Sequence, residues 1–202
     1  MTGPGAIWLA SASPRRRQIL AEAGYDVLVR PSDLDDATMK RGGVPVEAWV
    51  MALAFFKARR VADAIRRQQP NAAGIVLGAD TLCACDGRIL GQPRDAADAQ
   101  RMLRLLRERA HRTITGVALI DVRCGRRMLA ADSATVRVGR LGDEPIEAYV
   151  RSGDWRGKAG AYNLSERIEA GWPIDCDGDP ATVMGLPMRR LPAWLDRFAQ
   201  GH

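Results

Sequence analysis

Short apolar runs and amphipathic helical patterns alternate along this chain, and that alternation constrains its fold more than any other feature. Residues Gly74–Gly78 form a short apolar run, which is typical of a buried strand. Before it, from about Pro45 to Gln69, apolar side chains recur at helical spacing. Strands and helices in alternation, with hairpins inserted, predict an α/β protein. We therefore expect a mixed, twisted sheet flanked by helices.

The same patterns place the other elements. We expect further strands at 7–11, 25–31, 113–122 and 128–138, and further helices at 14–23, 96–109, 144–151 and 187–198. The strands at 113–122 and 128–138 should form a hairpin around Cys124-Gly125. No repeat or long linker separates these elements, and 202 residues suit a single domain, which we expect over residues 1–202.

Arginine supplies nearly all of the positive charge. Of the 30 basic residues only Lys40, Lys57 and Lys158 are lysines, and the formal net charge is +6. Such a chain could bind nucleic acid, anionic lipid or phosphorylated small molecules, although a genome-wide preference for arginine codons would also give this count. Because lysine is so rare here, each lysine is a candidate for a specific role.

Other features exclude whole classes of protein. No run of about 18 apolar residues is present, and the N-terminal charges follow the apolar stretch rather than precede it, unlike a secretory signal. We therefore expect a cytoplasmic protein without a membrane span. Cys83 and Cys85 alternate on a predicted strand and should pack in the core. His111 and the terminal His202 are the only histidines, and we expect His111 to be structural rather than part of a catalytic triad.

The segment from Ser11 to Arg17 joins the first predicted strand to the first predicted helix. Ser13 is a suitable N-cap, and Pro14 suits the first helical position. Three arginines follow in the first turn, where the helix dipole disfavours cations. Backbone N–H groups and guanidinium groups together suit an anion, above all a polyphosphate, although a solvated basic turn is the alternative.

Two charged residues occupy unusual positions. Lys57 lies near the middle of the apolar stripe of the predicted long helix, so it should meet a carboxylate or phosphate, or else extend to solvent. Asp80 follows the buried strand, at the end where α/β sheets bind ligands. It could hold a divalent cation or accept a proton from water, with capping of a turn as the alternative. Asp35 or Asp36 could supply a second carboxylate.

Two later segments are rich in small residues. Lys158-Ala159-Gly160-Ala161-Tyr162 allows close approach of the backbone. Gly185-Leu186-Pro187 should open the last helix in the manner of Ser13-Pro14.

Five separated motifs together resemble the Maf family, in the family's order and over nearly the whole chain. They are Ser11-Ala12-Ser13-Pro14-Arg15-Arg16, Gly78-Ala79-Asp80-Thr81, Thr115-Gly116-Val117, Lys158-Ala159-Gly160-Ala161-Tyr162 and Gly185-Leu186-Pro187. The resemblance implies two lobes around a central cleft, related in shape to the inosine triphosphatases. It also implies a cytoplasmic enzyme that uses a divalent metal, Mg²⁺ or Mn²⁺, to cut nucleoside triphosphates between the α and β phosphates.

By matching position, the resemblance implies roles for individual residues. Asp80 would accept the proton or hold the metal, Lys57 would assist it, and Asp36 would be a second metal ligand in place of the family's Glu. The implied substrate-binding residues are Ser11, Ser13, Arg15, Arg16, Thr81, Lys158 and Ser165. Of these, Arg15 and Thr81 lie where the family sets nucleotide specificity.

The chain departs from the family pattern in two places. Gln92 replaces the lysine of a Gly-Lys-Pro motif, and Arg94 or Arg88 could compensate for the lost charge. Ser165 stands where many members carry a glutamine that touches the base, which bears on base preference. Trp172 could stack on a base, but packing in the core is the simpler interpretation.

These observations predict a nucleoside triphosphate pyrophosphatase that acts on non-canonical or pyrimidine nucleotides and releases a monophosphate and pyrophosphate. Its partner would be the triphosphate substrate, with no membrane or nucleic acid, and a homodimer is left open. The alternative is a catalytically weak nucleotide- or nucleic-acid-binding protein, with which the missing lysine is compatible. Three Tyr and three Phe are too few for a broad stacking surface on nucleic acid.

Overall fold

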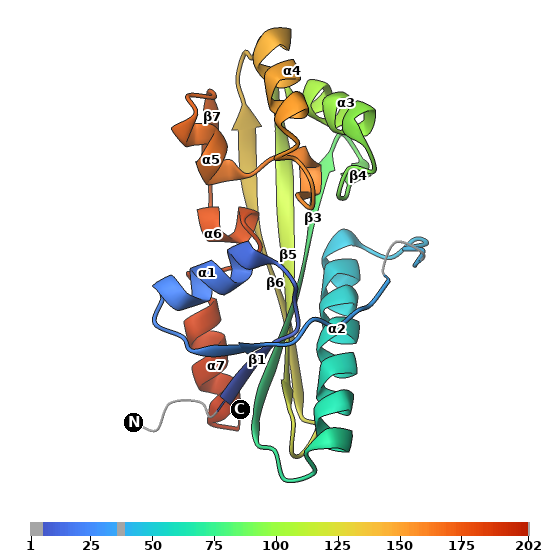
Figure 1. Cartoon of the computed structure of the whole chain (residues 1–202), viewed down its shortest axis with the longest axis vertical. Helices are drawn as coiled ribbons and strands as arrows, with labels where there is room; N and C mark the ends of the chain where they lie inside the picture. The colour runs from blue at the N-terminus through green and yellow to red at the C-terminus, as the bar shows by residue number, and fades with distance from the viewer. Residues whose placement is uncertain (1–5, 36–38, 202) are drawn as a thin grey trace. The chain divides into compact units, whose positions relative to one another are not determined.

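The computed structural model describes residues 6–35 and 39–201 (Figure 1). Its strands are β1 (Ala6–Leu9), β2 (Val27–Val29), β3 (Gly74–Cys85), β4 (Arg88–Leu90), β5 (Arg109–Asp121), β6 (Arg127–Val138) and β7 (Ile174–Asp177). Its helices are α1 (Pro14–Glu22), α2 (Val46–Gln68), α3 (Ala96–Leu106), α4 (Asp143–Ser152), the 3₁₀ helix η1 (Ala159–Ala161), α5 (Leu164–Glu169), α6 (Pro180–Val183) and α7 (Leu191–Ala199).

The strands form one mixed sheet. Their order is β2-β1-β3-β5-β6-β7, and β4 pairs with β3 outside this path. β1 runs parallel to both β2 and β3, whereas β4 and β7 run antiparallel to their neighbours. The predicted α/β class with a mixed sheet is therefore confirmed.

The chain divides into two compact units. Unit 1 comprises residues 1–80, 115–132 and 185–202, and unit 2 comprises residues 81–114 and 133–184. Because β3, β5 and β6 each contribute residues to both units, the chain passes between them several times. The two lobes implied by the family resemblance are thus present, whereas the assignment of residues 1–202 to a single domain stays a prediction.

The core of unit 1 lies where α2 packs on the sheet. Small side chains of the helix, such as Ala54 and Ala58, are fully buried against apolar side chains of β1, β3 and β5. Two glycines permit this close approach. A Cβ atom at Gly78 would lie 2.3 Å from the carbonyl oxygen of Ala54, and one at Gly116 would lie 2.5 Å from that of Val50. Larger residues at these positions would push the helix off the strands.

Unit 2 has its own core, in which α3 and α4 pack with the second half of β3. Cys83 and Cys85 are buried there, as their alternation predicted. Trp172 is also buried, and its ring meets that of Tyr149 edge-on at 5.3 Å between centroids. The interpretation of Trp172 as a packing residue is therefore confirmed.

Several element boundaries differ from the sequence-based expectations. β3 continues past Gly78 to Cys85, and β2 covers only three residues. Between the expected helices at 144–151 and 187–198, where the sequence patterns predict no element, the structure contains α5 and β7. The last helix begins at Leu191 rather than Pro187, because residues 187–190 form a separate turn and Pro192 takes the first-turn position.

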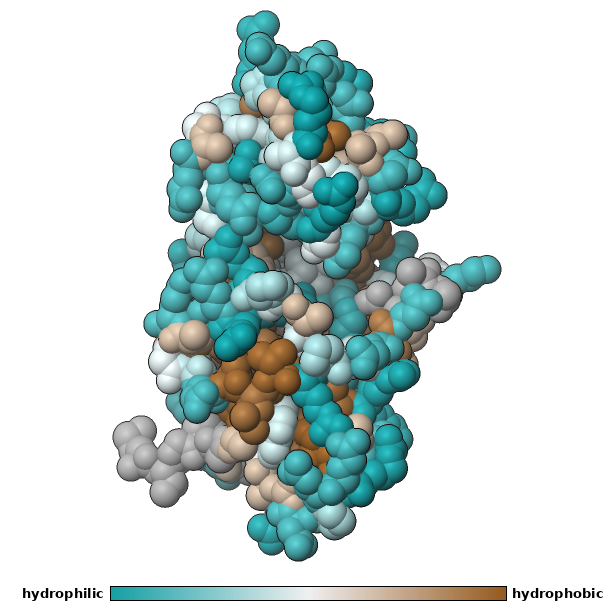
Figure 2. Space-filling model, viewed as in Figure 1, coloured by the Kyte–Doolittle hydropathy of each residue, from teal (hydrophilic) through white to brown (hydrophobic). Residues whose placement is uncertain are grey.

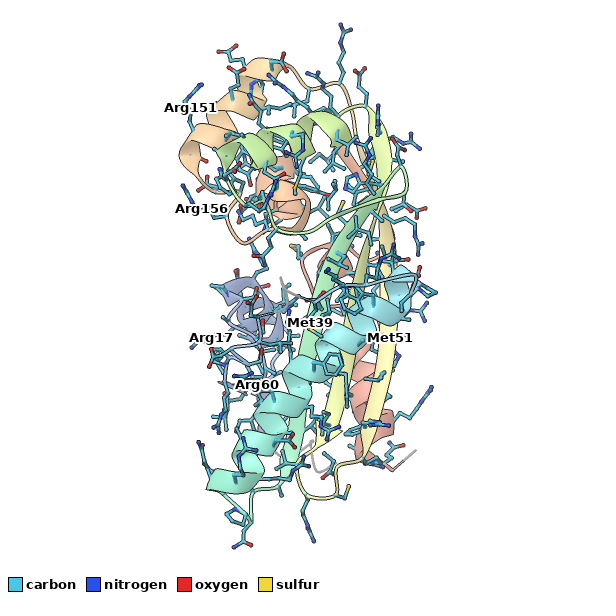
Figure 3. All side chains as sticks on the ribbon, turned by 90° about the vertical axis from the view of Figure 1, so that its right-hand side faces the viewer. Arg17, Met39, Met51, Arg60, Arg151 and Arg156 are labelled. Carbon is cyan, nitrogen blue, oxygen red and sulfur yellow. The ribbon has the colours of Figure 1, made fainter. Side chains whose placement is uncertain are left out.

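The arginines labelled in Figure 3 all extend from the surface. Arg17 and Arg60 do so in unit 1, and Arg151 and Arg156 do so in unit 2, and all four are exposed. An arginine excess spread over both units fits a general preference for this residue. Within the described residues, no helix is both long and apolar enough to cross a membrane.

Candidate active site

The N-terminus of α1 is built as its sequence predicted. Ser13 is the N-cap, Pro14 follows in the first turn, and the Ser13 side chain accepts a hydrogen bond from the backbone N–H of Arg16 at 3.4 Å. The first turn contains no acidic residue. Backbone N–H groups and arginine side chains therefore meet at one helix end, an arrangement that suits an anion.

Ser11 and Arg16 are held together beside this helix end. The hydroxyl of the buried Ser11 accepts hydrogen bonds from Arg16 Nη1 at 3.1 Å and from the backbone N–H of Ser13 at 3.2 Å. Arg16 Nε donates to the carbonyl oxygen of Gly185 at 2.9 Å. These contacts fix the guanidinium group before any anion arrives, which lowers the entropy lost on binding.

Gly185 has a different role from the one its motif predicted. It does not open the last helix but contacts Arg16, from which it is 169 positions away in the chain. Its φ is +108°, and a Cβ atom there would lie 2.9 Å from Arg16 Nε. Glycine is therefore required both by the backbone conformation and by the arginine that packs on it.

Lys57 and Asp80 form a largely buried ion pair. Lys57 Nζ lies 2.6 Å from Asp80 Oδ1, and the two side chains are only 15% and 9% exposed. Lys57 therefore meets a carboxylate, one of the partners that its place on the apolar stripe predicted. The second oxygen of Asp80, Oδ2, is buried and has no hydrogen-bond partner among residues 6–35 and 39–201. A buried, unsatisfied carboxylate oxygen is costly unless a ligand, an ion or water satisfies it.

The close approach of α2 at Gly78 positions this pair. Gly78 contacts Ala54 and Ala58 of the helix, and Asp80 follows Gly78 by two residues on the same strand. Lys57 directly precedes Ala58 in α2. The packing of the helix on Gly78 therefore also brings the ammonium group of Lys57 to the carboxylate of Asp80.

Ser11 and Asp80 both lie just beyond the last parallel pair of β1 with β3, and Asp80 is still within β3. β1 is parallel to β3 with Leu9 opposite Leu77, and the backbone N–H of Ala10 donates to the carbonyl oxygen of Leu77 at 2.8 Å. Ser11 lies two residues beyond Leu9, and Asp80 three beyond Leu77. The start of α1 and the ion pair therefore both lie where the parallel pairing of β1 with β3 ends, the region in which α/β proteins commonly bind ligands.

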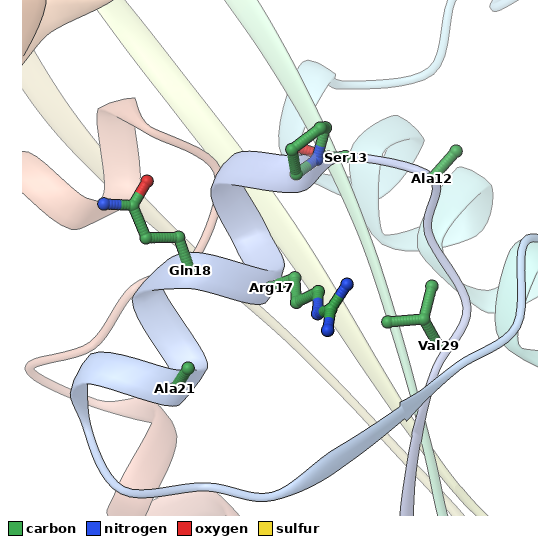
Figure 4. A pocket seen from close by; sticks show the side chains of 7 residues that line it. Ala12, Ser13, Arg17, Gln18, Ala21 and Val29 are labelled. Carbon is green, nitrogen blue, oxygen red and sulfur yellow. The ribbon is translucent and has the colours of Figure 1, made fainter.

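A hollow of about 380 Å³ lies on unit 1 beside α1 (Figure 4). It is lined by Ala12, Ser13, Pro14, Arg17, Gln18, Ala21 and Val29. Ser13 is the only predicted site residue in this lining, and neither Lys57 nor Asp80 takes part. The hollow is therefore separate from the ion pair.

In unit 2, the predicted residues Lys158 and Ser165 contact neighbours on one short segment. Lys158 Nζ lies 2.5 Å from Glu166 Oε2. The Ser165 hydroxyl donates to Asn163 Oδ1 at 2.9 Å, and Asn163 is the N-cap of α5. Thr81, the first residue of unit 2, is partly buried.

Tyr162 anchors the segment that carries Lys158. Its hydroxyl lies 2.8 Å from His111 Nε2, and both side chains are buried. Burial raises the pKa of Tyr162 well above its ordinary value and lowers the pKa of His111 to about 4. Both groups are thus neutral at pH 7, which fits the expected structural role of His111.

Some predicted site residues lie elsewhere or outside the described residues. Asp36 falls outside them. Arg15 Nη1 donates to Gln18 Oε1 at 3.3 Å on the outer part of α1. Gln92 is exposed, and Arg94 Nε donates to Asp98 Oδ2 at 3.2 Å. Compensation by Arg94 for the missing family lysine stays a prediction.

Asp80 is the best candidate for holding a divalent cation, because the described residues contain no larger group of metal-binding side chains. Over residues 6–35 and 39–201, no three acidic, His or Cys side chains gather into a metal site. Mg²⁺, however, is commonly bound by one or two carboxylates together with substrate phosphates. The unsatisfied Oδ2 of Asp80 suits that manner of binding.

Comparisons with known proteins agree on one family. The family model described as Maf-like protein matches residues 6–198. A dTTP/UTP pyrophosphatase of Ruminiclostridium cellulolyticum is 35% identical, with 95% of each chain covered. One of Moorella thermoacetica is 40% identical over 94% of this chain and 93% of its own, and one of Salinibacter ruber is 40% identical over 91% and 86%.

Proposed function

The chain belongs to the Maf family, and on that premise we propose that it hydrolyses a nucleoside triphosphate between the α and β phosphates. The products would be a nucleoside monophosphate and pyrophosphate. Because three similar relatives are named dTTP/UTP pyrophosphatases, we propose dTTP and UTP as the substrates.

The observation that carries this proposal is the state of Asp80. One carboxylate oxygen is held by Lys57 at 2.6 Å, and the other is buried and unsatisfied, three residues beyond the last parallel pair of β3 with β1. Lys57 holds the carboxylate in a fixed orientation, so Oδ2 can accept a proton from an attacking water. The new bond forms between this water and the α phosphorus, and the bond to the bridging oxygen breaks to release pyrophosphate.

The helix end beside Ser11 is suited to the triphosphate. Arg16, fixed by Ser11 and Gly185, would donate to phosphate oxygens, as would the backbone N–H groups at the start of α1. Arg15 and Ser13 lie on the same turn and would add to this group. We also assign Thr81, Lys158 and Ser165 to substrate binding, on the family resemblance alone.

A divalent cation, Mg²⁺ or Mn²⁺, is part of the proposal. As the alternative to accepting the proton, Asp80 Oδ2 would hold this ion together with substrate phosphates, and Asp36 is proposed as a second ligand. When bound, such an ion neutralises phosphate charge and lowers the pKa of a bound water.

The test is a panel of nucleoside triphosphates, scored separately for pyrophosphate and orthophosphate, with and without Mg²⁺ or Mn²⁺. We expect pyrophosphate from dTTP and UTP, and its loss in Asp80→Asn. That variant keeps the shape of the side chain but removes the charge that Lys57 faces, so it should stay folded at the assay temperature with a lower midpoint of thermal unfolding. Wild-type turnover by Asp80→Asn would refute the role of Asp80.

The binding alternative gives a different result in the same panel. A protein that binds nucleic acid without catalysis would release no pyrophosphate, and its affinity for DNA or RNA would fall steeply with salt.

We further propose that the enzyme works in the cytoplasm. In support, Cys83, Cys85 and Cys124 are free thiols, which suits a reducing compartment.

A further inference from the structure

The excess of positive charge belongs to unit 1 alone. The residues of unit 1 include 17 arginines and lysines but only 11 acids, whereas unit 2 has 13 of each. A general preference for arginine explains the high count in both units, but it does not explain why acids balance the charge in only one of them. Unit 1 carries the whole net charge of +6, and such a field attracts polyanions.

Two acid-free segments of unit 1 hold most of this excess. Residues 64–79 contain two arginines and no Asp or Glu, and residues 122–131 contain three arginines and no Asp or Glu. The first segment runs from the last turns of α2 into β3, and the second forms the turn between β5 and β6 and the start of β6. Both therefore concentrate positive charge where elements of unit 1 end.

The two segments meet in space. A Cβ atom added at Gly125, in the turn, would lie 3.6 Å from Arg66 Nη1 near the end of α2. The backbone N–H of Val122 donates to the carbonyl oxygen of Gly74 at 3.0 Å. Figure 1 shows the turn between β5 and β6 beside the end of α2, at the bottom of the view.

Two further guanidinium groups converge on one aromatic ring at this surface. The Cζ atoms of Arg127 and Arg59 lie 5.3 Å and 5.9 Å from the centroid of the Phe55 ring. Both arginines are exposed, so their N–H groups stay accessible while the ring restrains them. We call the following arginines the basic end of unit 1: Arg59, Arg66, Arg67, Arg123 and Arg127.

Few of these charges are neutralised within the protein. Asp63 pairs with both Arg59 and Arg66, so one carboxylate serves two arginines. Asp121 Oδ1 accepts the backbone N–H groups of Arg123 and Cys124 at 2.8 Å and 3.0 Å, and so it holds the turn. In the described part of the chain, the other three arginines of the basic end form no ion pair.

The residues around the basic end favour a phosphate backbone as the partner. Neither acid-free segment contains an aromatic residue on which the bases of a single strand would stack. Leu129, 42% exposed, is the one exposed large apolar side chain in the two segments, which is too little to enter a lipid surface. Figure 2 likewise shows mostly hydrophilic atoms at the lower end of its view.

The turn between β5 and β6 favours DNA among the double helices. These strands are neighbours in the sheet and are joined by only five residues, so they end in a two-stranded ribbon. The residues at its tip, 123–125, are exposed. The major groove of B-form DNA admits a two-stranded ribbon, whereas the major groove of A-form RNA is too narrow for one.

We propose that the basic end is a docking surface for double-stranded DNA, bound through its phosphates without sequence preference. The turn enters the major groove, and the arginines of α2 contact the flanking phosphates. The surface is separate from the proposed active site, because Arg66 follows Lys57 by nine residues, about 13 Å along the helix axis. Binding of a duplex needs no stacking surface, so the expectation that nucleic acid is not a partner is revised.

The main test is the binding of a labelled DNA duplex of about 20 base pairs, measured by fluorescence anisotropy over a range of salt concentrations. We expect a micromolar dissociation constant at low salt that rises steeply as salt is added. The triple variant Arg67→Gln, Arg123→Gln and Arg127→Gln should raise this constant at least about tenfold and lower the slope of log affinity against log salt by about 2 to 3. A wild type that does not bind the duplex at low salt would overturn the proposal.

A matched triple variant in unit 2 controls for the change in net charge. Arg137→Gln, Arg140→Gln and Arg151→Gln removes three exposed arginines and should leave the dissociation constant within about twofold of the wild type. Equal losses of affinity in the two triple variants would mean that overall charge, and not the basic end, attracts the duplex.

A gain of affinity provides a test that does not depend on removing arginines. Asp63→Asn frees Arg59 and Arg66 from their shared carboxylate, so it should tighten DNA binding several-fold. Asp143→Asn also removes a carboxylate that pairs with two arginines, but in unit 2, and should have no effect. Unchanged affinity in Asp63→Asn would contradict the role of α2 in this surface.

Other polyanions identify the partner. Duplex RNA of the same sequence should bind several-fold more weakly, and vesicles containing phosphatidylglycerol should not bind at physiological salt. Equal affinity for RNA, or binding to vesicles that the unit 1 triple variant abolishes, would overturn the assignment to DNA. Pyrophosphate release from dTTP and UTP should be the same in all these variants, so a failure of the proposed function would appear in the wild type and leave the DNA result intact.

Discussion

Lys57 Nζ lies 2.6 Å from Asp80 Oδ1, so the longest helix of unit 1 and a central strand are joined by a charged contact with little access to water. Breaking such a pair leaves one charge buried without its partner, which costs more than the intact pair contributes. Within the described part of the chain the second oxygen of Asp80 has no hydrogen-bond partner, so Lys57 is the main contact that orients this carboxylate.

Replacing Lys57 tests that dependence. We expect Lys57→Met to lower the free energy of unfolding by roughly 1–3 kcal/mol and pyrophosphate release by about a hundredfold or more. Lys57→Arg keeps the charge but not the geometry, so it should keep more stability than activity. Lys40→Met removes an exposed lysine and is the matched control, with both properties unchanged. Full activity in Lys57→Met would contradict the role of the pair.

A second prediction concerns the close packing of α2 against Gly78 of the sheet. A Cβ atom at Gly78 would lie 2.3 Å from the Ala54 carbonyl oxygen, which is backbone and cannot move alone. Gly78→Ala should therefore lower the free energy of unfolding by about 1–3 kcal/mol, measured by chemical denaturation. Gly43 has no atom within 4 Å of an added Cβ, so Gly43→Ala should have little effect. Equal stability of the two variants would contradict this packing argument.

Local sequence rules predicted the residues of the ion pair, but not all of their contacts. Lys57 on an apolar stripe and Asp80 after a buried strand each follow from short-range periodicity, and the sheet then brought them together. The contact between Arg16 and Gly185 joins residues 169 positions apart, so no local pattern could indicate it. Gly185 belongs to a sequence motif, but the proline of that motif, Pro187, predicts the start of a helix and not a contact with Arg16.

The same limit explains the errors in element boundaries. β3 runs on past Gly78 because β4 pairs with its second half, and this pairing is not visible in the apolar run itself. The last helix starts at Leu191, although both Pro187 and Pro192 suit the first turn of a helix. Residues 187–190 form a separate turn, which leaves Pro192 in the first turn of α7.

Gly185 allows Arg16 to be tested without changing it. Gly185→Ala should displace the guanidinium group, because the new Cβ would lie 2.9 Å from Nε. We expect about a tenfold or larger rise in KM for the triphosphate, similar to that of Arg16→Lys, which keeps the charge but loses the forked donors. Steady-state kinetics on both variants provide the measurement. If Gly185→Ala alone leaves KM unchanged, Arg16 does not depend on this contact.

His111 should make stability fall in mild acid. Burial lowers its pKa to about 4 in the folded protein, whereas the unfolded chain has the ordinary value of 6.5. Between these values the unfolded chain binds the proton and the folded chain does not, so stability decreases as pH falls from 6.5 to 4. The loss amounts to roughly 3 kcal/mol at most and is absent above pH 6.5. Denaturation curves of the wild type and His111→Gln across this range should show a shallower decline in the variant, and parallel declines would contradict the assignment.

Glu166 should weaken substrate binding through Lys158. The carboxylate lies 2.5 Å from Lys158 Nζ, so a phosphate that uses this ammonium must displace it. Glu166→Gln removes the competing charge, and we expect a several-fold lower KM for the triphosphate with kcat little changed. Glu169→Gln, at an exposed position on the same helix, controls for the change in net charge. In a Lys158→Met background, Glu166→Gln should have no further effect on KM, because the group it restrains is gone. A fall in KM that persists there would mean that Glu166 repels the triphosphate directly rather than through Lys158.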